Sequence, residues 1–171
     1  AAWPVVNGLI FLLRSPGAAL NEVVIALMDR THAAQNLRRF ATLLLAITGA
    51  IVLLIVATPL ANIWLTVVMA LPADLIPISQ GALWLGAGLP LLSVLMSWFQ
   101  GRIMHSRHTR SITEASALYS LLMVAILGAG IATQRFTGLY VAVAANSLAG
   151  LAQVGWLWFK SRTALREVRT I

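Results

Sequence analysis

Two side chains of opposite charge lie close together in an apolar stretch near the start of the chain. Arg14 and Glu22 flank the dipeptide Pro16-Gly17, and Asn21 adds an amide beside Glu22. A charge at membrane depth costs at least about 2.5–3.5 kcal/mol, so it normally faces a partner or water. Arg14, Asn21 and Glu22 are therefore a candidate intramembrane polar site. Two interpretations stay open: a functional path, or a structural role in which Arg14 forms a salt bridge or reaches the interface from a re-entrant turn.

Other residues that could do chemistry form no complete site. His105 and His108 have the spacing of one helical face, but zinc would need further ligands and the neighbouring Arg residues disfavour a cation. We therefore interpret this segment as a solvated loop. The sequence has no Cys, no glycine-rich phosphate loop, no zinc-protease motif and no nucleophile elbow. We expect no enzymatic activity, no cofactor and no metal.

Composition places the chain in a membrane. Of the 171 residues, 60% are apolar and only 10% are charged, whereas a soluble domain has about 25% charged residues. The net charge of +7 would suit nucleic acid, but there is too little polar surface to cover a soluble globule. We expect no nucleic-acid partner, and we place the positive charges at the ends of membrane segments. Residues 1–171 are expected to form a single transmembrane helical domain.

Five segments could cross a bilayer, each needing about 20 helical residues. We predict an all-α, polytopic bundle of about five spanning helices, the first of them broken at Pro16-Gly17. Two short helices, one of them re-entrant or interfacial, are the alternative for this first segment. Pro59 disfavours a helical Thr58, so the second helix should end there and a short helix or loop should follow. The predicted spans are Trp3–Met28, Phe40–Ala57, Leu75–Phe99, Ile112–Thr133 and Gly138–Phe159.

Basic residues predict the orientation. Five crossings bring three basic clusters to one side, and the positive-inside rule makes that side cytoplasmic. The C-terminus is then cytoplasmic and Ala1 lies outside, in what we expect to be a bacterial inner membrane. Membrane lipids are expected partners, with Lys160, Arg162 and Arg166 as headgroup contacts. The clusters are Arg30, Arg38 and Arg39; Arg102, Arg107 and Arg110; and Lys160, Arg162, Arg166 and Arg169.

Short motifs along most of the chain resemble one group of membrane exporters. They are Arg14-Ser15-Pro16-Gly17 followed by Asn21 to Leu27, Leu37-Arg38-Arg39-Phe40, Thr58-Pro59-Leu60-Ala61 with Trp64, Gln100-Gly101-Arg102, Thr109-Arg110 and Gly138-Leu139. The chain resembles the multidrug/oligosaccharidyl-lipid/polysaccharide exporter superfamily, which includes multidrug and toxic compound extrusion proteins and polysaccharide-lipid flippases.

The resemblance implies a fold and a function. Members of this superfamily have twelve helices in two lobes around a central cavity, and the chain would match the last five. It would then be a fragment or one lobe of an exporter that moves an amphipathic or lipid-linked substrate by alternating access. Glu22 would carry a proton or cation, and Arg14 would be its counter-charge or an anion contact. The alternative is a non-catalytic subunit packed within a larger membrane complex. In both cases the partners include further transmembrane helices, from the missing lobe or from other subunits.

Overall fold

Helices make up nearly all of the chain in the computed structural model, which describes residues 2–27, 33–105, 109–133 and 137–168. No strand occurs in these ranges. Five helical stretches are long and apolar enough to cross a membrane, which confirms the predicted all-α bundle with five spanning segments. They are Ala2–Leu27, Gln35–Ala57, Ala73–Met104, Arg110–Thr133 and Gly138–Arg162.

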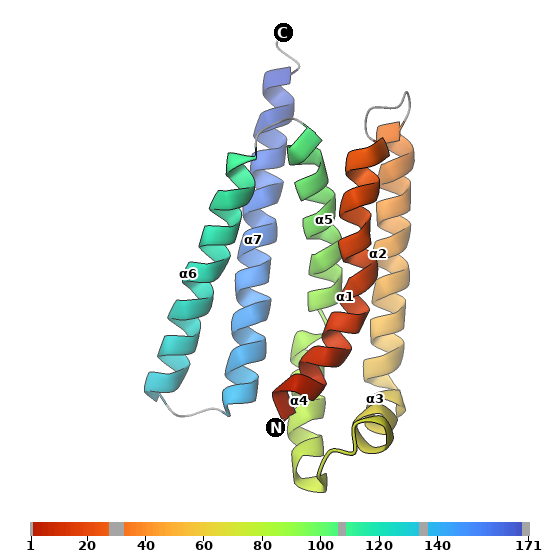
Figure 1. The fold of residues 1–171 in the computed structure, drawn as a ribbon, viewed down its shortest axis with the longest axis vertical. Coiled ribbons are helices and arrows are strands. Elements are labelled where there is room, and N and C mark those ends of the chain that lie inside the picture. The colour runs from red at the N-terminus through yellow and green to blue at the C-terminus, as the bar shows by residue number, and fades with distance from the viewer. Residues whose placement is uncertain (1, 28–32, 106–108, 134–136, 169–171) are drawn as a thin grey trace.

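The spanning segments alternate in direction along the bundle (Figure 1). The first described helix begins at the lower end of Figure 1, and the last described helix finishes at the upper end. In order, the elements are α1 (Ala2–Leu27), α2 (Ala33–Ala57), α3 (Leu60–Ile63), η1 (Trp64–Val68), η2 (Ala73–Leu75), α4 (Ile76–Gly86), α5 (Leu89–His105), α6 (Arg110–Thr133) and α7 (Gly138–Val168).

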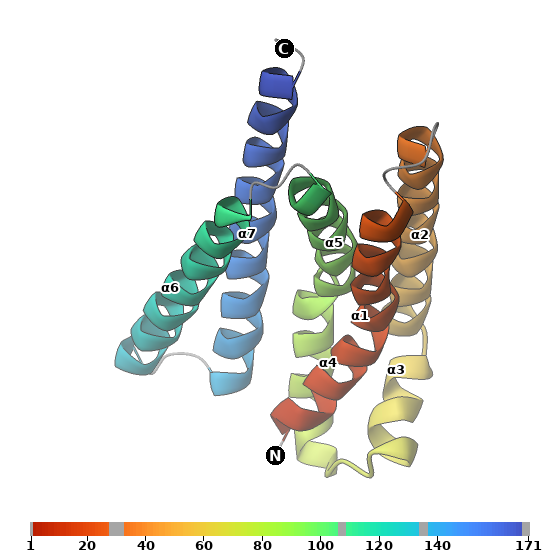
Figure 2. The same cartoon turned by 45° about the horizontal axis from the view of Figure 1, so that its top comes forward.

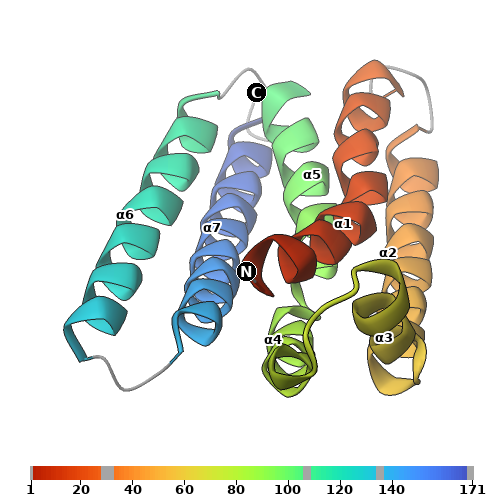
Figure 3. The same cartoon turned by 60° about the horizontal axis from the view of Figure 1, so that its bottom comes forward.

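Lateral contacts give the bundle the form of a row rather than a closed ring. Helix α6 packs on α7, α7 packs on α4 and α5, and α5 packs along α1, while α2 contacts both α1 and α5. Figure 3 shows this order from α6 at one edge to α2 at the other. Side chains on α6 illustrate the result: Leu121, Val124 and Ile131 are 70%, 72% and 74% exposed. Such surface suits lipid or further helices, because neither penalises an apolar side chain.

Thr58 and Pro59 end α2, as predicted. The helix stops at Ala57, and the Thr58 hydroxyl both donates to the Leu54 carbonyl at 2.5 Å and accepts from the Leu60 amide at 3.4 Å. Pro59 has no amide hydrogen to continue the ladder. The short helix α3 and the π-helical turn η1 follow, and they lie across the lower end of the bundle (Figure 2).

The third span is broken, which the sequence did not lead us to expect. Helix α4 ends at Gly86 and α5 begins at Leu89, so Ala87 and Gly88 interrupt the span. Pro90 cannot donate to the Gly86 carbonyl four residues earlier. The Ala87 amide instead donates to the Trp84 carbonyl at 3.3 Å, which closes α4 with a tight last turn.

Several helices are longer than predicted at the end of the bundle that carries the basic residues. Helix α2 begins at Ala33, α5 continues to His105 and α7 continues to Val168. Arg38, Arg102 and Lys160 therefore lie within helices rather than in loops. This end, where α2 and α6 begin and α5 and α7 finish, is called the basic end below.

Candidate functional site

Helix α1 does not break at Pro16-Gly17, and this expectation was wrong. The helix is continuous from Ala2 to Leu27 with Pro16 inside it, although its ribbon bends between its two ends (Figure 3). Proline removes one backbone hydrogen bond and pushes the preceding turn away, which bends a helix whose neighbours hold it together. A neighbouring helix contacts α1 at this bend, because the Ser93 hydroxyl of α5 donates to the Arg14 carbonyl at 3.2 Å.

Gly17 brings α1 very close to α5 at this bend. A Cβ added to Gly17 would lie 2.5 Å from Ser93 Oγ and 2.8 Å from the Val94 amide nitrogen. Seven residues later on each helix the roles are exchanged, because a Cβ on Gly101 would lie 2.5 Å from Val24 Cγ1. Glycine is needed at both places, since any side chain would push the two backbones apart.

Arg14 and Glu22 do not share a pocket. Arg14 is half-buried and Glu22 is exposed. Eight residues of continuous helix separate them by about 12 Å along the axis. Among the residues described, no ion pair joins either of them to an acid or a base. The predicted pocket needed a break in α1, and the continuous helix keeps the two charges apart.

Asn21 lies about 100° around the axis of α1 from Glu22 and faces α5. Its Oδ1 is buried, accepts no hydrogen bond from the part of the chain that the structure describes, and lies 3.6 Å from the position of a Cβ on Gly101. Asn21 is thus part of the α1–α5 contact, and it does not join Arg14 and Glu22 in one site.

Glu22 belongs to an exposed face of α1. Phe11, Ser15, Ala18 and Glu22 follow one another at intervals of four, three and four residues, and all four are exposed. This spacing places them on one side of a helix. We call these residues the outer face of α1; Arg14, half-buried, lies at its edge.

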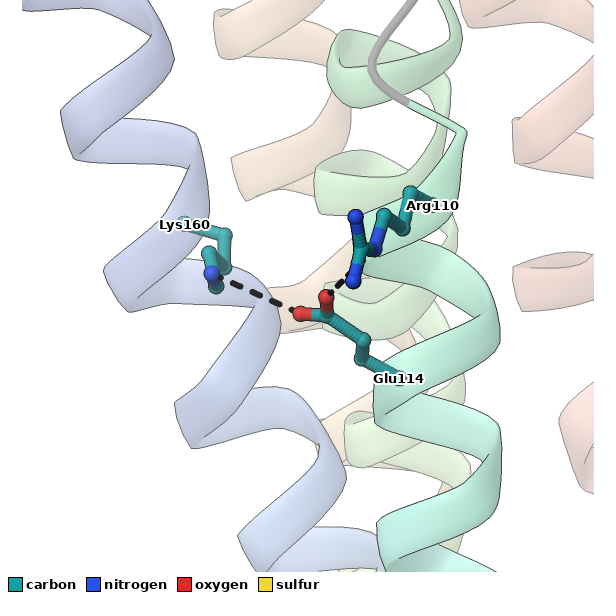
Figure 4. Close-up of polar contacts among 3 residues, drawn as sticks. All are labelled: Arg110, Glu114 and Lys160. Atoms are coloured by element: carbon teal, nitrogen blue, oxygen red, sulfur yellow. Dashed lines mark ion pairs between the residues drawn. The ribbon is translucent and has the colours of Figure 1, made fainter.

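An ion-pair network joins α6 to α7 at the basic end (Figure 4). Glu114 Oε1 lies 3.3 Å from Arg110 Nε, and Glu114 Oε2 lies 3.4 Å from Lys160 Nζ. Oε2 is buried and accepts no hydrogen bond of good geometry, so the contact with Lys160 is a charge interaction. From the sequence, we assigned Glu114 only a favourable position in the first turn of its helix. The four-residue spacing of Arg110 and Glu114 indicates that these two can form an ion pair. No local pattern in the sequence indicates the contact of Glu114 with Lys160.

Three tryptophans at the basic end each carry a cation one turn later on the same helix. Arg102 lies 5.7 Å from the centre of the Trp98 ring, Lys160 lies 5.1 Å from that of Trp156, and Arg162 lies 3.8 Å from that of Trp158. A ring face attracts a cation placed over it, and such pairs suit the headgroup level of a bilayer.

The residues predicted to contact headgroups differ in their surroundings. Lys160 is paired with Glu114. Arg162 is exposed over Trp158. Arg166 lies in α7, but its side chain is outside the described residues.

Other predicted and unpredicted polar groups lie elsewhere in the bundle. His105 is the last residue of α5, whereas His108 falls outside the described residues. Tyr119 donates to Asn146 Oδ1 at 2.9 Å, a second polar link between α6 and α7.

A cavity of about 350 Å³ opens between α2, α3 and α4, away from the basic end. It is lined by Val56, Thr58, Ala61, Pro77, Gln80, Gly81, Leu83 and Trp84.

No known family, curated protein or solved structure matches the chain. The fold and the contacts above define a helical protein with five potential membrane spans.

Proposed function

We propose that the chain is one lobe of a flippase-like exporter, which moves an amphipathic or lipid-linked substrate by alternating access. The observation that carries the proposal is the outer face of α1. It presents Glu22, with Arg14 at its edge, inside a potential membrane span and without any ion pair within the described chain. Exposing these charges to the hydrocarbon of a bilayer costs free energy. Water or another protein surface must therefore cover this face.

In the exporter, the outer face of α1 lines the path between two lobes. Glu22 exchanges a proton or a cation with water there, and Arg14 holds an anionic group of the substrate. The close α1–α5 contact at Gly17 and Gly101 makes these two helices move together. Rocking of this unit against a second lobe would expose the outer face of α1 to each side of the membrane in turn. The resemblance to the exporter superfamily supports the same arrangement.

We also propose an orientation for the exporter. The basic end faces the cytoplasm of a bacterial cell, and the protein lies in the inner membrane. Basic residues of α2, α5, α6 and α7 gather at this end of the bundle (Figure 1), and cytoplasmic loops normally carry the excess of Lys and Arg.

A structural subunit of a larger membrane complex is the second candidate. The cavity between α2, α3 and α4 is not lined by Arg14, Asn21 or Glu22. This cavity therefore does not connect the candidate polar residues to a path through the chain. In a subunit of this kind, a partner helix covers the outer face of α1 and supplies an acid for Arg14.

Water access to the outer face of α1 separates the two candidates. The chain has no Cys, so single cysteines can be introduced directly. We expect Ser15→Cys and Ala18→Cys to react with a charged, membrane-impermeant thiol reagent, because a thiolate forms in water and not in hydrocarbon. Leu121→Cys on α6, which is 70% exposed, is the lipid-facing control and should stay unreacted until detergent is added. Protection of Ser15→Cys and Ala18→Cys in the intact membrane would reject the exporter and favour the subunit.

A further inference from the structure

Two arginines from different helices lie on neighbouring turns at the basic end. Ala41 of α2 packs in one apolar cluster with Val94 of α5, and Trp98 packs against that cluster. Arg38 lies one turn beyond Ala41, and Arg102 lies one turn beyond Trp98. Because α2 enters the bundle where α5 leaves it, both turns point toward the basic end.

Nothing in the described part of the chain neutralises this pair. Arg102 is half-buried over the Trp98 ring, with its guanidinium carbon 5.7 Å from the ring centre. Arg38 and Arg102 carry like charges on neighbouring turns of α2 and α5, and like charges placed close together repel each other. No described acid forms an ion pair with Arg38 or Arg102, in contrast to Lys160, whose charge meets Glu114.

The surroundings of the pair define the ligand that would fit. Arg102 lies near the end of the potential span Ala73–Met104, which is the level of lipid headgroups when the span crosses a bilayer. Guanidinium groups bind phosphate oxygens in pairs of parallel hydrogen bonds. A tryptophan ring below them suits the boundary between headgroup and acyl chain.

We propose that Arg38 and Arg102 together bind the phosphoryl group of an anionic phospholipid, held between α2 and α5 above Trp98. The anion removes the repulsion between the two guanidinium groups and joins the ends of the two helices. This site lies apart from the outer face of α1. It stands whether or not the chain transports a substrate.

The test compares the protein in nanodiscs of phosphatidylcholine with and without phosphatidylglycerol. Two readouts are used: the preference for spin-labelled phosphatidylglycerol over spin-labelled phosphatidylcholine, and the melting temperature. The variants are Arg38→Gln, Arg102→Gln and the control Arg162→Gln. The control removes the same charge from the same end of the bundle, also one turn after a tryptophan, but from a site without a second arginine.

Each substitution at the pair should lower the preference for phosphatidylglycerol by more than the roughly fivefold that a single basic residue at an anionic surface contributes, because it removes one of two guanidinium groups from the same phosphoryl group. The melting temperature of Arg38→Gln should change in opposite directions in the two lipids. It should rise in phosphatidylcholine, where repulsion is relieved, and fall relative to the unchanged protein in phosphatidylglycerol. Arg162→Gln should show no such reversal.

Inorganic phosphate added to phosphatidylcholine nanodiscs tests the source of the anion. If phosphate alone raises the melting temperature of the unchanged protein but not that of Arg38→Gln, the pair binds the phosphoryl group without needing the lipid. The proposal is overturned if Arg162→Gln lowers the lipid preference as much as Arg38→Gln does. It is also overturned if Arg38→Gln has the same effect on melting in both lipids.

Discussion

The Val24 side chain of α1 occupies the place that a side chain on Gly101 of α5 would need, since its Cγ1 lies 2.5 Å from the position of a Cβ there. Seven residues earlier, Gly17 of α1 makes the reciprocal contact with Ser93 and Val94 of α5. Each helix thus contributes one glycine to the α1–α5 contact. This exchange holds the bend in α1 against α5 and leaves the outer face of α1 turned away from the bundle.

Adding one methyl group at Gly17 should therefore destabilise the protein. Gly17→Ala places a Cβ 2.8 Å from the Val94 amide nitrogen, a backbone atom that cannot rotate away. We expect a loss of about 1–3 kcal/mol, the usual cost of overpacking, measured as a lower melting temperature in detergent.

Gly128→Ala is the matched control for this experiment. Nothing lies within 4 Å of a Cβ at Gly128 in α6, and alanine is favoured over glycine in a helix by about 0.5–1 kcal/mol. This variant should be unchanged or more stable. Equal losses at both glycines would show that the α1–α5 contact is not as close as described.

A double-mutant cycle on Glu114 and Lys160 should reveal coupling between α6 and α7. The two side chains are 34% and 32% exposed, so solvent screens their attraction and the coupling should be about 0.2–1 kcal/mol. Glu114→Gln, Lys160→Gln and the double variant would be compared by their unfolding free energies in mixed micelles.

Arg110 provides the comparison within the same network. Its side chain is 93% exposed and pairs with Glu114 along a single helix. We expect its coupling to Glu114 to stay at the low end, at about 0.3–0.5 kcal/mol. The absence of measurable coupling between Glu114 and Lys160 would contradict the interhelical role of Glu114.

Ala70 should be improved by glycine. Its φ of 46° lies in the left-handed region, which costs residues other than glycine about 1–2 kcal/mol. We expect Ala70→Gly to raise the unfolding free energy by about 1 kcal/mol after the greater chain entropy of glycine is included. Ala125→Gly, at an exposed position in the middle of α6, should lower it by a similar amount. If both substitutions act in the same direction, the backbone conformation at Ala70 is not the cause.

The proposed orientation predicts which ends of α6 meet each solution. Thr109 and Thr137 are exposed and flank α6. Thr109→Cys should react with an impermeant thiol reagent in inside-out vesicles, and Thr137→Cys should react in intact spheroplasts. The reverse pattern would place the basic end outside. Ser161 would be a poor reporter, because it is only 4% exposed and its hydroxyl donates to the Trp158 carbonyl.

Hydropathy and local stop signals predicted the spans well, because both act within a few residues. Thr58-Pro59 shows this for the end of α2. We predicted a break at Pro16, but the broken helix is the third span, just before Pro90. Contacts between helices explain the difference. Ser93 and the close packing at Gly17 hold α1 together around Pro16, whereas the glycines on both sides of Ala87 weaken the helix before Pro90.

The candidate site was predicted less well than the fold. Spacing shows that Asn21 and Glu22 are neighbours in sequence, but not that Asn21 faces α5 while Glu22 faces outward. The contact of Glu114 with Lys160 depends on how α6 packs on α7. Such relationships between helices have no local signal in a sequence whose helices are apolar on most sides.

The hydrogen bond from Ser93 to the Arg14 carbonyl joins residues 79 positions apart, and this separation has a consequence for biogenesis. Helix α1 is among the less apolar spans, with a mean hydropathy of 1.5 against 2.7 for the second span, and it contains two charged residues and an internal proline, Pro16. During synthesis it emerges long before α5 and must wait in or beside the translocation channel without its partner. A chain truncated before α5 should therefore leave α1 poorly inserted and open to quality-control proteolysis, while the more apolar second span inserts by itself.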